Sequence, residues 1–217
     1  MPHSMKKKSL KNSQKKVVNK FTKNDLAFIE FVKAECKELG VKVDLRPSKY
    51  VKLDKNIQCS GWFDSENKQL VVAMNRPDAL SILVHEYCHV TQWIEGIDLW
   101  VKSDDALLKV DQWLGGKRIH HIDKHLAIAR DLELDNEKRA VRMIRKWNLN
   151  INVDDYIRKA NAYVHFYNWI RHTRKWSKPG NTPYSNSLVL SRMSTRFNMQ
   201  YMRLTPHVKA AFVAAKI

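Results

Sequence analysis

The spacing of apolar side chains changes from helical to alternating along the first third of the chain. Between residues 26 and 39, apolar positions recur at intervals of three and four, which predicts an amphipathic helix ending at Gly40. Residues 41–45 alternate between apolar and polar side chains and predict a strand. Residues 59–64 and 68–74 predict the two strands of a hairpin.

The rest of the chain has a mostly helical pattern. The apolar run 79–84 follows Pro77, a residue that favours the first turn of a helix. Helical spacing returns after Gly96 in four stretches, at residues 104–114, 118–148, 154–176 and 206–216. The pattern predicts an α+β fold in which a small antiparallel sheet packs on the helix containing residues 79–84, followed by a mostly helical C-terminal half.

Length and composition restrict the organisation of the chain. Its 217 residues suit one domain with a sizeable core. Residues 1–24 hold eight Lys and no acidic residue, so we expect a disordered basic tail followed by a single domain over 25–217. The lysine-rich residues 5–24 lack the apolar stretch of a secretory signal, so we do not expect them to be one, and no apolar run approaches the ~20 residues that cross a bilayer. Three widely spaced cysteines favour reduced thiols, so we expect a cytoplasmic protein with no membrane partner.

Positive charge is concentrated in two regions. The formal net charge is +17, and residues 138–178 carry eleven basic but only two acidic side chains. Together with the basic tail, this asymmetry predicts nucleic acid as a partner, bound through phosphates without sequence preference. A solubilising surface is the alternative. The side chains expected at phosphates are Lys6, Lys7, Lys8, Lys15, Lys16, Arg142, Arg145 and Lys146.

The apolar run leads into the pentapeptide His85-Glu86-Tyr87-Cys88-His89, an H-E-x-x-H motif. On a helix, His85 and His89 are one turn apart and project from one face, where both imidazoles reach the same Zn²⁺. Glu86 lies to one side, where its carboxylate reaches a water on the metal. The motif predicts zinc as the cofactor and Glu86 as the general base of metal-assisted hydrolysis.

A catalytic zinc needs a third protein ligand. The metzincin solution requires Gly and His three and six residues after the second His, and Gln92 and Glu95 stand there instead. Glu133 and Glu137 are better candidates, because they are at i and i+4 in the middle of a predicted helix. One would bind the metal while the other hydrogen-bonds a ligand histidine, and the spacing leaves open which does which.

Two other residue sets meet part of the requirement. His121 and His125 are also at i and i+4, but their surroundings are charged and no Glu follows His121, so we interpret them as surface or supporting histidines. Cys59 would be the upstream ligand of a peptide deformylase, but its neighbours Gln58 and Ser60 do not match the Glu-Gly-Cys context of that family.

The motif and the downstream E-x-x-x-E pair resemble the gluzincin branch of the zincin metallopeptidases. The string ending at Gln92 is similar to the H-E-x-x-H-V-x-Q form of microbial and phage zincins. The resemblance covers roughly residues 41–148 and implies a zincin-like fold. It implies that Glu133 joins the two motif histidines as the third zinc ligand. Glu137 would then be the supporting carboxylate, although many gluzincins have Asp at that position.

The resemblance also implies two further parts of a peptidase site. An edge strand before the metal helix aligns the peptide substrate, and residues 68–74 are the matching strand here. A Tyr or His from the C-terminal part donates a hydrogen bond to the oxyanion, and Tyr167 and His165 are the candidates for this role.

These observations together predict a zinc metallopeptidase, a hydrolase that cleaves a protein or peptide substrate and acts near nucleic acid. The alternative is a nucleic-acid-binding protein on a zincin scaffold with little or no catalysis. The intact motif favours the enzyme, because a binding module has no need of Glu86. The basic tail and the basic C-terminal half favour binding.

Overall fold

The computed structural model describes residues 21–53, 57–178 and 180–217, and these fold into two compact units. Unit 1 comprises the described residues up to Thr91 together with Arg142–Ile151, and unit 2 comprises Gln92–Val141 and Asn152–Ile217. Each unit is assembled from two separate stretches, and two long helices run across the division. The sequence predicted a single domain over residues 25–217, and this stays a prediction.

Unit 1 contains the strands. Its elements in chain order are α2 (Lys23–Glu38), β1 (Lys42–Arg46), β2 (Val51–Lys52), β3 (Gln58–Cys59), β4 (Gly61–Asp64), β5 (Gln69–Ala73) and α3 (Ala79–Glu95), the last of which enters unit 2 at Gln92. The coarse α+β prediction is confirmed, and so is the hairpin, because β4 and β5 pair antiparallel.

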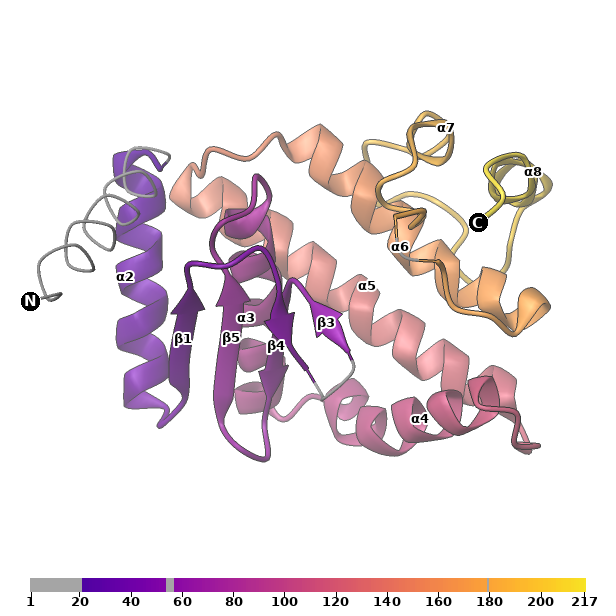
Figure 1. The fold of residues 1–217 in the computed structure, drawn as a ribbon, viewed down its shortest axis with the longest axis horizontal. Helices are drawn as coiled ribbons and strands as arrows, with labels where there is room; N and C mark the ends of the chain where they lie inside the picture. The colour runs from indigo at the N-terminus through magenta and orange to yellow at the C-terminus, as the bar shows by residue number, and fades with distance from the viewer. Residues whose placement is uncertain (1–20, 54–56, 179) are drawn as a thin grey trace, which may run out of the picture. The chain divides into compact units, whose positions relative to one another are not determined.

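The main sheet differs from the prediction in the arrangement of its strands. Its order is β1-β5-β4, with β1 parallel to β5, so the sheet is mixed rather than antiparallel (Figure 1). Residues 68–74 were expected to form an edge strand, and this is wrong, because β5 lies between β1 and β4. Since β1 occupies the other side of β5, the hairpin strand that lies at an edge of the sheet is β4. Strands β2 and β3 form a separate antiparallel pair.

Helix α2 starts earlier than the predicted end of the basic tail at residue 24. A capping box fixes this start, because the Thr22 hydroxyl accepts a hydrogen bond from the Asp25 N–H and the Asp25 carboxylate accepts one from the Thr22 N–H. The buried Asp25 carboxylate also accepts the N–H of Asn150, which ties α2 to the second stretch of unit 1. Residues 1–20, which hold most of the predicted tail, lie outside the described part of the chain.

Unit 2 is helical. Its elements are α4 (Asp98–Leu114), the part of α5 (Ile122–Trp147) up to Val141, α6 (Val153–Thr173), α7 (Ser187–Leu190) and α8 (Pro206–Ala214). Four of them overlap the predicted helices at 104–114, 118–148, 154–176 and 206–216. Helix α4 begins at Asp98 rather than residue 104, α5 begins at Ile122 rather than residue 118, and α7 was not predicted. None of the helices in the described ranges is long and apolar enough to span a bilayer.

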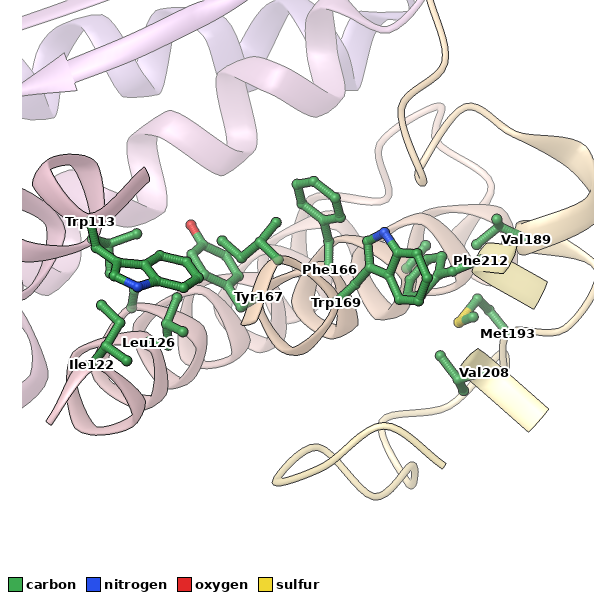
Figure 2. Packing of buried hydrophobic residues seen from close by; sticks show 14 residues of the cluster. Trp113, Ile122, Leu126, Phe166, Tyr167, Trp169, Val189, Met193, Val208 and Phe212 are labelled. Carbon is green, nitrogen blue, oxygen red and sulfur yellow. The ribbon is translucent and has the colours of Figure 1, made fainter. Parts of the chain in front are cut away.

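The core of unit 2 is built around aromatic side chains of α4 and α6, as Figure 2 shows. Trp113 of α4 and Phe166 and Trp169 of α6 are buried in this cluster. Phe212 of α8 packs on Trp169 with ring centroids 5.5 Å apart, and the Trp169 indole N–H donates to the carbonyl of Ile217. The core therefore extends to the last residue of the sequence.

Candidate metal centre

The H-E-x-x-H motif lies on α3, a helix of 17 residues, as the sequence predicted. The two Nε2 atoms of His85 and His89 are 3.2 Å apart, and the ring planes are nearly perpendicular at 85°. Zinc binds imidazole nitrogen at about 2.0–2.1 Å, so two ligands of one tetrahedral ion lie roughly 3.4 Å from each other. The histidine pair therefore has the nitrogen spacing that a shared zinc ion requires.

Glu86 faces the segment that contains β3 and β4. A Cβ added at Gly61 of β4 would lie 3.2 Å from Cγ of Glu86 and 2.7 Å from Cγ2 of Ile82, so β4 approaches α3 as closely as a glycine allows. Burial, and after it the negative charge of Glu86, raises the pKa of the Cys59 thiol. The carboxylate of Glu86 thus lies beside the edge strand of the sheet.

Glu133 lies on α5 with 9% of its surface exposed, and Glu137, one turn later, is 5% exposed. Within the described residues, His85, His89 and Glu133 form a group whose ligand atoms all lie within 4.8 Å of one another. This donor set of two imidazoles and one carboxylate fits zinc and leaves the fourth position of a tetrahedral ion for water. Glu137 does not belong to the group.

The two candidate oxyanion donors lie on different faces of α6. Desolvation and then the negative charge of Glu133 raise the pKa of Tyr167 and of Tyr163, whose hydroxyl groups are 3.3 Å apart. His165 is fully buried and stacks on Tyr201 with ring centroids 5.3 Å apart. Of the two candidates, Tyr167 is therefore the one whose pKa is raised by the charge of Glu133. Tyr163, four residues earlier, lies on the same face of α6.

The alternative metal ligands are not brought together. His121 precedes α5 with a φ of 53°, so it does not share a helical turn with His125, as the i, i+4 spacing had suggested. His125 lies 4.0 Å from the carboxylate of Asp105. In the part of the chain that the structure describes, neither histidine nor Cys59 belongs to a group of three or more close metal-ligating side chains.

The residues predicted to bind nucleic acid fall into two sets. Lys6, Lys7, Lys8, Lys15 and Lys16 lie outside the described residues. Arg142, Arg145 and Lys146 are exposed on the last turns of α5, at i, i+3 and i+4 spacing that puts them on one face. Within the described ranges, none of these three forms an ion pair, and we call them the basic face of α5.

The sequence pattern alone did not identify Gly61 or the hydrogen-bond partners of Gln92 as parts of the site. Gly61 carried a usable signal, because a glycine inside a strand pattern often marks a close backbone approach. Gln92 was noted as a departure from the metzincin pattern and as the end of the H-E-x-x-H-V-x-Q string, but no contact was predicted for it. Its hydrogen-bond partners lie some 40 residues away in sequence, and no local pattern indicates them.

Comparison with known proteins adds no further constraint. No protein-family model, no curated protein and no solved structure matches this chain. Any functional conclusion therefore depends on the site itself.

Proposed function

We propose that this protein is a zinc-dependent peptidase whose metal ligands are His85, His89 and Glu133. The observation that carries the proposal is the 3.2 Å spacing of the two histidine Nε2 atoms, together with the Glu133 carboxylate in the same group. Three protein ligands that leave one open position are typical of a catalytic rather than a structural zinc site. The nearly buried Glu133 supports this assignment, because a carboxylate removed from water is most readily accommodated beside a cation.

Zinc, when bound, lowers the pKa of a coordinated water towards neutrality and polarises the substrate carbonyl. Glu86 takes the proton of the attacking water on its carboxylate and delivers it to the leaving amine, which returns Glu86 to its charged form. Its neighbour on α3, Tyr87, is 4% exposed and anchors this part of the helix. Tyr87 packs edge-on against Phe28 of α2, with ring centroids 6.2 Å apart.

The substrate in this proposal is an extended peptide that pairs with β4. Strand β4 is at the edge of the main sheet and therefore has backbone groups available for strand addition. Because Gly61 of β4 lies against Glu86, a peptide on this strand would pass the general base. The hydroxyl group of Tyr167 is assigned to the oxyanion, since among the two candidates it is the one influenced by the charge of Glu133.

Hydrolysis of a fluorogenic peptide library tests the proposal. The wild-type protein loaded with zinc should cleave some members of the library, and a chelator should abolish the cleavage. Glu86→Gln should retain zinc but lose about 10²–10⁴-fold in rate, because the amide is nearly isosteric but does not accept a proton. A Glu86→Gln variant as active as the wild type would remove Glu86 from the mechanism.

A second function, nucleic-acid binding, is favoured by the basic face of α5. Its three exposed side chains are not engaged in ion pairs within the described residues, and the formal net charge is +17. In this second proposal the protein binds phosphates without sequence preference, and catalysis is minor or absent. A binding titration against duplex DNA at low salt separates the two functions, because the Glu86→Gln variant should bind DNA as the wild type does.

A further inference from the structure

Gln92 is a fully buried polar residue one turn beyond His89 on α3. Its side-chain amide N–H group donates to the carbonyl oxygen of Leu132 at 3.1 Å and to the carboxylate of Asp135 at 2.8 Å, both on α5. The Leu132 carbonyl belongs to the peptide group that joins Leu132 to Glu133. The amide of Gln92 therefore holds the turn of α5 that carries Glu133 against the turn of α3 that follows His89.

A second contact extends this link between the same two helices. Arg139 donates from Nε to the Asp135 carboxylate at 2.6 Å and from Nη1 to the Glu95 carboxylate at 2.7 Å. Glu95 is three residues after Gln92 on α3, so both lie on the side of the helix that faces α5. Hydrogen bonds to Glu95 and Asp135 raise the pKa of Arg139, which therefore remains charged between the two carboxylates.

We propose that Gln92 is a positioning residue for the metal centre, which sets the position of the Glu133 carboxylate relative to the two histidines. The inference rests on the proposed zinc site and assigns it a support that crosses from one ligand helix to the other. Ligands on separate helices must be held to within about 0.5 Å for tight metal binding. A buried amide with two acceptors restricts both sliding and rotation of α5 beside α3, whereas an apolar contact would restrict neither direction specifically.

The test compares the zinc affinity of Gln92→Met with that of the wild type. Met has a similar length and no branch, so the helix and the packed volume are retained while both hydrogen bonds are lost. Zinc dissociation constants are measured by competition with a chromogenic chelator, and the site is also loaded with Co²⁺ to record its visible absorption spectrum. We expect zinc binding to weaken about 10–100-fold and the Co²⁺ bands to shift, because support of this kind orients the ligands.

Asn161→Leu is the matched control. Asn161 is also fully buried. Its amide donates to the carbonyl groups of Ser194 and Arg196, which lie in the segment between α7 and α8, and not to α5. The control should lose thermal stability yet keep the zinc affinity and Co²⁺ spectrum of the wild type. If Gln92→Met does not fold, Asp135→Asn replaces it, because it weakens the Gln92 hydrogen bond while keeping an acceptor.

The outcomes distinguish the inference from the proposed function. Wild-type zinc affinity in Gln92→Met and in Asp135→Asn would overturn the positioning role and leave the zinc site standing. An equal loss of affinity in Asn161→Leu would also overturn it, because the effect would then be one of general stability. Failure of the wild type to bind zinc at all would overturn the proposed function, and the positioning role with it.

Discussion

His165 is expected to make the protein less stable as the pH falls from 7 to 4. The imidazole is fully buried on α6, and neither ring nitrogen has a hydrogen-bond partner among the residues that the structure describes. Burial, and then the positive charge of Arg130, lowers the pKa of His165 from 6.5 to about 4. The imidazole also stacks on the ring of Tyr201, which stays neutral in this pH range because its pKa is raised to about 12.

The size of the effect follows from linkage between protonation and folding. In the unfolded chain His165 takes up a proton near pH 6.5, whereas in the folded protein it does so only near pH 4. The unfolded state therefore binds more protons between these values, and stability that is fully present above pH 6.5 is lost as the pH falls towards 4. At 1.36 kcal/mol per pKa unit, the free energy of unfolding decreases by about 3 kcal/mol in total and by about 2 kcal/mol between pH 7 and 5.

Urea denaturation of the wild type and His165→Leu at pH 7, 6 and 5 measures this decrease. Leu has a similar volume and does not titrate, so the wild type should lose about 2 kcal/mol more than the variant between pH 7 and 5. A chelator removes metal from both proteins, and all other titrating groups cancel in the difference. His172→Leu, the same change at an exposed position of α6, should follow the wild type. Parallel curves for the wild type and His165→Leu would refute the argument from burial.

Three further predictions concern the site and the charged surface. Gly61→Ala should lower the free energy of unfolding by about 1–3 kcal/mol and slow peptide hydrolysis, because the new Cβ would lie 2.7 Å from Ile82 and displace Glu86. Urea denaturation measures the first effect and kcat the second. Wild-type values for both would contradict the prediction. Tyr167→Phe should lower kcat about 10²-fold with unchanged zinc content, and an unchanged kcat would exclude the hydroxyl from the oxyanion site. Replacing the three cations of the basic face of α5 by Gln should make DNA binding less sensitive to salt. The slope of log K against log salt concentration should become shallower by about 0.9 per lost phosphate contact. If the wild type fails to bind DNA at low salt, the charge serves only solubility.

Local patterns in the sequence were sufficient for the elements that carry the site. The helix around His85 and His89 follows from the apolar run before it, and the β4–β5 hairpin follows from alternation on both sides of a short polar turn. The pairing of β1 does not follow in the same way. Alternation shows that residues 41–45 form a strand, but it does not say that the strand pairs parallel with β5 across the hairpin.

Contacts between distant segments were the part that the sequence did not specify. Tyr167 and His165 are two positions apart, so a helix puts them on different faces, but only the packing of α6 on α5 decides which face meets Glu133. The hydrogen bond from Gln92 to Leu132 likewise depends on the relative register of two helices. The charge and spacing of Glu133 and Glu137 left both open as the metal ligand. Among the described residues, the group of close ligand atoms that could hold a metal contains Glu133 but not Glu137.

The zinc content of Glu133→Gln compared with Glu137→Gln tests the central claim most directly. Both substitutions remove one buried carboxylate from α5, one turn apart, so their effects on the helix should be similar. Elemental analysis after dialysis against trace zinc should find one zinc ion per chain in the wild type and in Glu137→Gln, and almost none in Glu133→Gln. Full zinc occupancy in Glu133→Gln, or no zinc in the wild type, would contradict a metal centre formed by His85, His89 and Glu133.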